Sequence, residues 1–300
     1  INMGTTTFSG PLRSQDSVRL VSKNTTTGLI QDRTFSAGVR DSRRYYLEEW
    51  FKHVPKLNAV NTIDPDADDA SALALYTLAN KDFEVLGTNM TSALSTFNAT
   101  AAGITLTTAG ADQDQAIVLP HLDSNQTAWT NTKWGTENQV HWECSINTNA
   151  IDNQKLWAGL KLTNDQLVAT DADQAYFKFQ TDATNSESFD DFTKWHFIHS
   201  IDGTDFISQL PITVAANTIY HFKIEIDADR KLSIFVDGVQ YNITSTSGST
   251  GGTAVTSGTT KSGAMTDDVD LIPYIGIEAG AAAAEAVDVH YQCISRTIFE

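Results

Sequence analysis

One run of residues, from Ile219 to Tyr241, constrains the fold more than any other part of the sequence. Apolar side chains occupy every second position in its first half: Tyr220, Phe222, Ile224 and Ile226. A polar turn follows at 228–231, and a second apolar run follows at 232–236. Asp237-Gly238 then offers another turn, in which the glycine can take a positive φ. This period of two predicts an antiparallel hairpin with one buried face.

Short β-rich runs separated by Asn, Asp, Gly and Thr continue this pattern along most of the chain. We expect strands near 83–88, 94–98, 103–108, 115–120, 138–147, 155–162, 174–180, 195–201, 205–209, 219–227, 231–241, 271–279 and 286–298. So many short strands predict a mostly β protein in which two antiparallel sheets of about six strands each pack face to face. The Ser/Thr/Gly-rich stretch 245–263 predicts a mobile loop at one end of this sandwich.

The composition supports a folded chain with an acidic body. Hydrophobic residues make up 41% of 300 residues, which is enough for a substantial core. Residues 1–56 hold nine Lys/Arg and five Asp/Glu (net +4), and residues 57–300 hold eleven and thirty-two (net −21), which together give the formal charge of −17. An acidic body repels phosphate backbones, so we expect no nucleic-acid partner. The basic front segment would be attracted to an acidic surface.

The chain divides into three predicted parts. Residues 1–40 are rich in Thr, Ser and Gly and predict an extended arm that is ordered only against a partner. Residues 41–80 predict a helical linker, with a helix from about Ser42 to His53 that ends at Pro55 and a short helix at 70–78. The aromatic stripe of the first helix suits docking either on the body or on a neighbouring subunit. Residues 81–300 predict the sandwich.

No cofactor or metal site emerges from the sequence. Cys144 and Cys293 stand far apart, without a CxxC pair or a Cys/His cluster, so we expect buried free thiols in place of zinc ligands or a disulfide. His196 and His199 would point to opposite faces of one strand, which is unsuited to joint metal binding. The acidic stretch 64–69 resembles the start of a calcium loop but lacks its glycine and its final glutamate.

The sequence also lacks the common catalytic and membrane signals. No Gly-x-Ser-x-Gly, P-loop or dinucleotide-binding motif is present, so we expect no catalytic residues. No apolar run approaches the ~20 residues that a bilayer crossing requires, and we expect no membrane partner.

Two stretches resemble the concanavalin/laminin-G-type jelly rolls. The hairpin at 217–239 is similar to the back-sheet hairpin of these domains, and the runs 142–146 and 156–160 are similar to paired strands of the same fold. The resemblance implies a jelly-roll sandwich. It implies little about function, because this fold carries lectins, hydrolases and passive modules.

Two further stretches resemble virion structural proteins of tailed bacteriophages, including cyanophages. The run 3–12 is similar to their N-terminal arms, and the run 273–280 is similar to phage structural proteins with such a sandwich. The resemblance implies a non-enzymatic decoration or cement protein on the outer capsid surface, whose partners are the major capsid protein and sister copies in a homo-oligomer. The predicted contact residues are Phe8, Pro11, Arg13, Arg19, Arg33, Arg40, Tyr45, Trp50 and Phe51.

Two alternatives remain open at this point. The first is a carbohydrate-binding or host-recognition module of a tail fibre or knob, in which Trp129 and Trp134 would contact a surface glycan. The second is a hydrolase, because Glu225 and Asp227 resemble the acid pair of retaining β-glucanases with the concanavalin-like fold. A retaining mechanism needs two carboxyls ~5–5.5 Å apart. A turn between two strands explains the same residues more simply.

Overall fold

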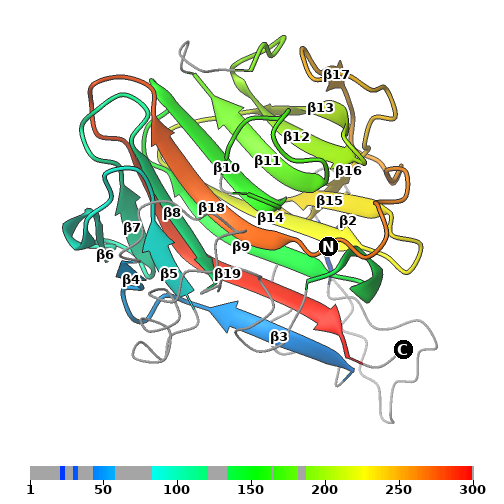
Figure 1. Cartoon of the computed structure of the whole chain (residues 1–300), viewed down its shortest axis with the longest axis horizontal. Coiled ribbons are helices and arrows are strands. Elements are labelled where there is room, and N and C mark those ends of the chain that lie inside the picture. Colours follow the sequence, from blue (N-terminus) through cyan, green and yellow to red (C-terminus); the bar gives the residue numbers. More distant parts are fainter. Residues whose placement is uncertain are drawn as a thin grey trace, which may run out of the picture.

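The computed structural model describes residues 43–57, 83–120, 134–163, 165–181 and 187–298, together with two short strands at 21–23 and 30–32. Within these residues, two large sheets pack face to face as the layers of a sandwich (Figure 1). Almost all strand pairs are antiparallel. The predicted jelly-roll sandwich of the concanavalin-like class is therefore confirmed.

The first layer is a nine-stranded sheet. Its strands lie in the order β17 (Thr253–Ala254), β13 (Thr204–Thr213), β12 (Lys194–Ile201), β11 (Gln174–Gln180), β10 (Gln154–Lys161), β18 (Ile272–Ala279), β8 (Gln115–Pro120), β5 (Phe83–Leu86) and β4 (Lys56–Leu57). Its central strands β10, β11 and β18 are buried along their whole length.

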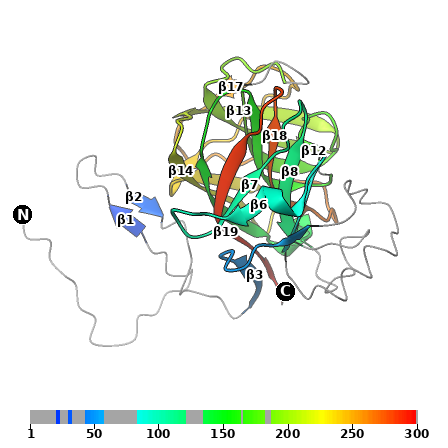
Figure 2. The same ribbon diagram turned by 90° about the vertical axis from the view of Figure 1, so that its left-hand side faces the viewer.

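The second layer is an eight-stranded sheet. Its strands are β16 (Val239–Tyr241), β15 (Leu232–Val236), β14 (Thr218–Ile226), β9 (His141–Thr148), β19 (Ala286–Thr297), β7 (Ile104–Thr107) and β6 (Ser95–Phe97), with β3 (Arg44–Glu49) paired to β19. The small hairpin of β1 (Val21–Lys23) and β2 (Ile30–Asp32) lies to one side of the sandwich (Figure 2), and β2 contacts β16. Two 3-10 turns, at Ser92–Leu94 and Thr136–Asn138, are the helical elements of the described residues.

The alternation that identified the hairpin is present in β14. Tyr220, Phe222, Ile224 and Ile226 are buried, whereas the residues between them are partly exposed. β14 pairs with β15 on one side and with β9 on the other. The ring of Phe222 stacks on Phe177 of β11, with ring centroids 4.4 Å apart, and therefore joins the two sheets. Apolar burial between the sheets supplies the main stabilisation of the sandwich.

The helix predicted at 42–53 is wrong, because residues 44–49 form strand β3. β3 adds to the part of β19 that β7 leaves uncovered, since β7 pairs with 286–289 and β3 with 292–297. Arg44 secures this pairing through hydrogen bonds from its guanidinium to the carbonyl oxygens of Gln139 (2.7 Å) and Ser295 (3.1 Å). The available sheet edge thus outweighed the helical pattern of this segment. Its aromatic residues also favour a strand. The predicted short helix at 70–78 lies outside the described residues.

Two smaller predictions have different outcomes. Cys144 and Cys293 are buried free thiols, as expected. The stretch 245–263, predicted as a mobile loop, instead lies against the sandwich: β17 pairs with β13, and the Leu232 amide donates to the Ser262 hydroxyl (2.9 Å). The described part of the chain contains no helix with the length and apolarity to cross a membrane.

His199 places a titratable ring inside the inter-sheet core. It lies on β12 and stacks on Phe197 and Phe206, with ring centroids 5.9 and 4.6 Å away. Burial lowers the pKa of His199 to about 3. The neutral ring is therefore the form that the folded protein accepts.

We expect His199→Leu to flatten the dependence of stability on pH in the acid range. The pKa of an unfolded histidine is ~6.5, so the unfolded chain binds more protons than the folded one between about pH 6.5 and about pH 3. The wild-type free energy of unfolding therefore falls as the pH drops through this interval. Urea unfolding across the interval measures the slope, with His53→Leu at an exposed position as the control. Equal slopes in both variants would contradict this assignment.

Candidate functional site

Most of the predicted capsid-contact residues lie outside the described residues: Phe8, Pro11, Arg13, Arg19, Arg33 and Arg40. Of the others, Tyr45 packs against Trp134 (ring centroids 5.9 Å apart), and Phe51 is 1% exposed against Phe83. Trp50 is 39% exposed and lies over the ring of Tyr291. The aromatic residues of this segment therefore dock on the body itself. The virion location, the capsid partner and the homo-oligomer stay predictions.

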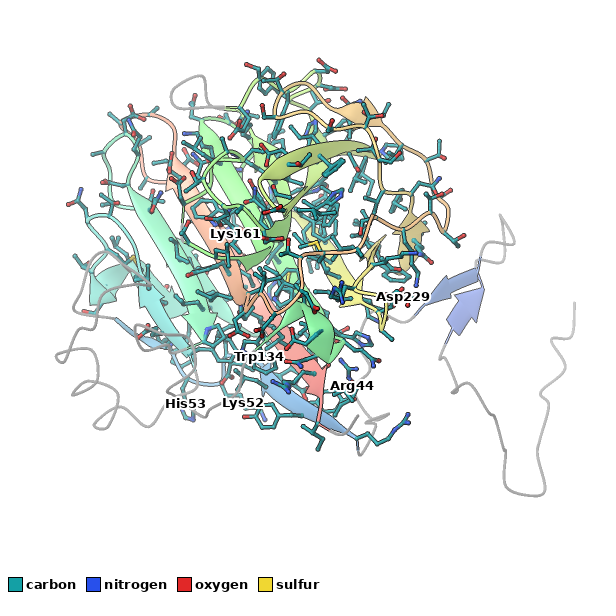
Figure 3. All side chains as sticks on the ribbon, turned by 45° about the vertical axis from the view of Figure 1, so that its right-hand side comes forward. Arg44, Lys52, His53, Trp134, Lys161 and Asp229 are labelled. Atoms are coloured by element: carbon teal, nitrogen blue, oxygen red, sulfur yellow. The ribbon has the colours of Figure 1, made fainter. Side chains whose placement is uncertain are left out.

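The residues of the two alternatives are not placed as an active or binding site. Trp129 lies outside the described residues, and Trp134 is only 4% exposed, inside the sandwich (Figure 3). Glu225 forms an ion pair with Lys223 (2.7 Å) on the surface of the eight-stranded sheet. Asp227 accepts the amides of Asp229 and Lys231 at 2.9 Å each, which is the work of a turn residue.

Charged, amide and aromatic side chains gather on a different surface. This is the face of the nine-stranded sheet that is turned away from the inter-sheet core, here called the outer face. Strand alternation sends Leu156, Ala158 and Leu160 of β10 into the core and leaves Lys155, Trp157 and Lys161 on the outer face. The buried apolar residues on the outer face form a cluster of their own, separate from the inter-sheet core. Its members are Leu86, Ile117, Leu119, Trp157, Val168, Tyr176, Phe189, Ile198, Ile207, Ile272 and Tyr274.

The strand register arranges the outer face in rows. One row contains Gln115, Glu278, Lys155 and Gln180. The next contains Ile117, Gly276, Trp157, Lys178 and His196. A third contains Tyr274, Gly159, Tyr176 and Ile198. Aromatic rings, lysines and amides thus share one continuous sheet surface.

Two glycines shape this surface. The indole of Trp157 lies over Gly276, where a Cβ would collide with the ring. Gly159, between Tyr274 and Tyr176, has a φ of +154°, and a Cβ there would collide with the backbone of β11. The glycines therefore let Trp157 lie flat against the sheet and leave no side chain between the two tyrosines.

A first buried ion pair lies in the row that contains Gln115, Glu278, Lys155 and Gln180. Lys155 Nζ lies 2.6 Å from Glu278 Oε1, and both side chains are almost fully buried. Gln115 donates to the other carboxylate oxygen of Glu278 at 2.7 Å. This carboxylate is therefore held from two strands, β10 and β8, on either side of β18.

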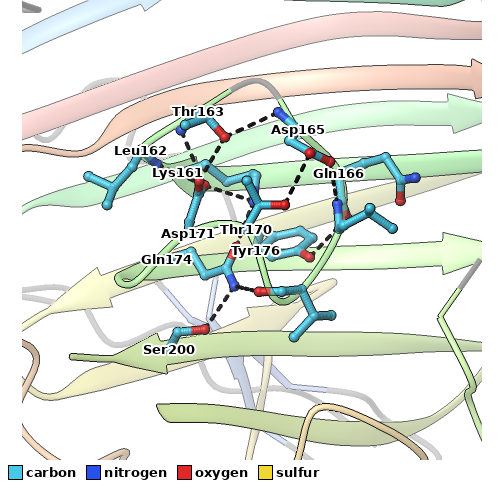
Figure 4. Close-up of polar contacts among 12 residues, drawn as sticks. Lys161, Leu162, Thr163, Asp165, Gln166, Thr170, Asp171, Gln174, Tyr176 and Ser200 are labelled. Carbon is cyan, nitrogen blue, oxygen red and sulfur yellow. Dashed lines mark hydrogen bonds and ion pairs between the residues drawn. The ribbon is translucent and has the colours of Figure 1, made fainter. Parts of the chain in front are cut away.

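A second network fastens loop 162–173 onto the outer face (Figure 4). Lys161 Nζ lies 3.0 Å from Asp171 Oδ2, donates to Gln174 Oε1 at 2.6 Å, and sits 4.3 Å from the centroid of the Tyr176 ring. Asp171 also accepts the amides of Leu162 and Thr163 and the Thr163 hydroxyl at 2.7–3.2 Å. These contacts satisfy a lysine that has lost all its water. Burial lowers the pKa of Lys161, and Asp171 opposes that shift.

A third group continues the cover over β11. The Gln166 carbonyl accepts hydrogen bonds from Tyr176 (3.1 Å) and Lys178 (2.8 Å). Lys178 Nζ also lies 3.7 Å from Glu187 Oε1, and burial lowers the pKa of Lys178 to about 7. The ring of Phe189 stacks on His196 at 3.9 Å between centroids.

Several buried polar atoms of the outer face lack a hydrogen-bond partner among the described residues: the donors Trp157 Nε1 and Tyr274 Oη, and both ring nitrogens of His196. Burial raises the pKa of Tyr274 well above its ordinary value, so its phenol keeps its proton. Unsatisfied buried donors cost ~1–3 kcal/mol each, and they are unusual enough to require an explanation. A ligand that accepts hydrogen bonds at this face would provide one.

The sequence contained part of this site. The strands at 155–162 and 174–180 were predicted, and alternation along them places the lysines on one face. Alternation alone does not separate Trp157, which lies on the outer face, from Trp142 and Trp195, which lie between the sheets. Among the described residues, no group of three or more His, Cys, Asp or Glu side chains is arranged to hold a metal ion.

Comparison of the sequence with protein-family models and with curated proteins finds no match. Solved structures with a similar fold include a protein of unknown function from Shewanella oneidensis, with 8% identity over 87% of this chain and 91% of that chain and a TM-score of 0.45. They also include an alginate lyase from Corynebacterium sp., with 12% identity over 68% and 82% and a TM-score of 0.40. The β-glucanase of Bacillus licheniformis has 9% identity over 72% and 92% and a TM-score of 0.42.

The prediction of a non-enzymatic protein is contradicted by this comparison. Alginate lyases, β-glucanases and a transglycosylase predominate among the similar structures, beside a carbohydrate recognition domain of the lectin type. At identities such as 8% and 12%, the similarity concerns the fold. None of the structures reported above is described as a virion protein.

We expect Lys161→Met to destabilise the protein by ~3–5 kcal/mol, because it leaves the carboxylate of Asp171 buried without its cation. The matched control is Lys223→Met, which removes the partner of Glu225 from a partly exposed pair of similar length. The control should cost less than ~1 kcal/mol. Urea unfolding of both variants measures the difference. Limited proteolysis should also show faster cleavage within 162–173 in Lys161→Met, and equal losses in the two variants would contradict the structural role.

Proposed function

We propose that this protein is a carbohydrate-active β-sandwich that binds a polysaccharide along the outer face of the nine-stranded sheet. Sugar rings have apolar faces that stack on aromatic side chains, and hydroxyl groups at their edges exchange hydrogen bonds with polar ones. Trp157, Tyr176 and Tyr274 offer such rings in adjacent rows. The single observation that carries the proposal is that Trp157 Nε1 and Tyr274 Oη lie buried there without partners.

The ligand would extend across the strands, from β18 over β10 to β11. Along this line the register places Tyr274, Gly159 and Tyr176 in one row and Gly276, Trp157 and Lys178 in the next. Because the residue between Tyr274 and Tyr176 in this row is Gly159, no side chain separates the two tyrosines. Because this surface spans three strands, it is long enough for several linked sugar units, and not only for a single sugar.

Binding at this face requires the cover to move. In the structure, loop 162–173 is fastened by Lys161, Gln174 and Tyr176, and the Gln174 amide donates to the Val168 carbonyl at 2.6 Å. We propose that this loop lifts to admit the ligand and that Phe189 moves away from His196 with it. Loops that close over a bound substrate are a common way to exclude water from such sites.

We expect Trp157→Phe and Tyr274→Phe to weaken polysaccharide binding about tenfold each. Each variant keeps an aromatic ring and removes one unpartnered donor, so a hydrogen bond to the ligand is lost. The stability of Tyr274→Phe should stay equal or rise, because the packing is retained and the buried donor costs free energy in the unbound protein. Trp157→Phe should lose stability, because the smaller ring leaves a cavity. Isothermal titration calorimetry with a panel of polysaccharides measures binding, and urea unfolding measures stability.

Trp195→Phe is the matched control for this experiment. Trp195 Nε1 is also buried without a partner, but its ring lies in the inter-sheet core against Phe222, with centroids 4.8 Å apart. The control should lose stability to a similar cavity and bind like the wild type. The proposal fails if no polysaccharide binds, or if the two outer-face variants bind as tightly as Trp195→Phe.

A further inference from the structure

We infer that the ligand of the outer face is an uncharged polysaccharide, with hydroxyl groups as its polar groups, and not a polyuronate or a sulfated chain. This inference rests on the proposed function and adds the chemical class of the ligand. It depends on which charged side chains lie on the outer face and on how they are paired.

The three buried lysines of the outer face, Lys155, Lys161 and Lys178, are each held by partners within the protein. Lys155 is paired with Glu278 at 2.6 Å. Lys161 is paired with Asp171 at 3.0 Å, and its remaining contacts are the Gln174 amide oxygen and the Tyr176 ring.

The third lysine, Lys178, is committed in the same way. It donates to the Gln166 carbonyl at 2.8 Å and also to the Gln166 side chain, and Glu187 lies 3.7 Å away. A carboxylate ligand would need a lysine to leave one of these partners. The displaced carboxylate would then be buried without a cation, which costs several kcal/mol.

Each buried lysine of the outer face has a carboxylate beside it. Glu278, Asp171 and Glu187 each face one of the three lysines, and Glu84 of β5 is a fourth buried carboxylate. Glu84 alternates with the core residues Phe83 and Val85, so it lies on the outer face. The formal charge of the face is therefore not positive, and the whole chain carries −17. A polyanion would meet repulsion both at a distance and on contact.

The other titratable groups of the outer face are suited to neutral partners. Burial raises the pKa of Tyr176 and Tyr274, so both remain phenols, and it lowers the pKa of His196 to about 4. It also lowers the pKa of Lys178 to about 7, so this lysine carries only part of a charge near neutrality. Phenol, indole and imidazole groups bind sugar hydroxyls without requiring a charge on the ligand.

The first test compares two sets of probes on the full chain. One set contains neutral hexasaccharides with gluco, manno and xylo configuration, and the other contains hexauronates of the same length. We expect at least one neutral probe to bind about tenfold or more tighter than every uronate. We also expect its affinity to be insensitive to salt, because no charges are paired on binding.

A charge variant sharpens the test. Glu278→Gln keeps an acceptor for Gln115 but removes the carboxylate from the Lys155–Glu278 ion pair, so it makes the formal charge of the outer face more positive by one. We expect this variant to gain affinity for uronates by about tenfold relative to wild type. Glu225→Gln is the control, because it makes the same change in the Lys223–Glu225 pair of the other sheet and should leave both sets of affinities unchanged.

The outcomes separate this inference from the function on which it rests. Tighter binding of a hexauronate by the wild type, with affinity that falls steeply as salt rises, would overturn the inference and leave the proposed function standing. Binding of neither set would overturn both. If Glu278→Gln does not fold, the comparison of the two probe sets on the wild type still decides the question.

Discussion

Burial on both faces of the central strands is the constraint on which the rest of this structure depends. β10, β11 and β18 are covered by the second sheet on one side and by loops of the chain on the other. Their inner face meets this constraint with apolar side chains. Their outer face contains lysines, and a lysine can be buried only beside an opposite charge and enough acceptors. The acidic residues Glu278, Asp171 and Glu187 supply those charges, two of them from the covering loops.

The strands could be predicted from the sequence because one physical rule governs them. Wherever one face is buried and the other is not, side chains alternate, and β14 shows this in nearly pure form. The predicted limits of β8 and β11 coincide with the observed ones. Alternation alone did not predict the structure of segment 44–49. Its residues suit either a helix or a strand, and the vacant half of β19, which only the folded protein contains, decided the outcome.

The outer face was harder to predict because its burial depends on partners distant in sequence. Lysine is almost never fully buried in proteins, so Lys155 and Lys161 look like surface residues in isolation. Lys155 finds Glu278 more than a hundred residues later. The local signal was the order of residues in β10, where two lysines and Trp157 share one face. That pattern shows which side chains lie together, but not whether a loop covers them.

The contacts of the cover explain how a closed face can still bind a ligand. Tyr176, Lys178 and Gln174 donate hydrogen bonds to the carbonyl oxygens of Gln166 and Val168. A sugar hydroxyl is an acceptor of similar strength, so exchanging loop carbonyls for ligand oxygens changes the free energy little. The net gain must therefore come from groups that the closed loop does not satisfy, which include Trp157 Nε1 and Tyr274 Oη, and from stacking on the rings that are exposed when the loop lifts. One set of residues therefore holds the loop in place, and a different set would gain hydrogen bonds when a ligand replaces the loop.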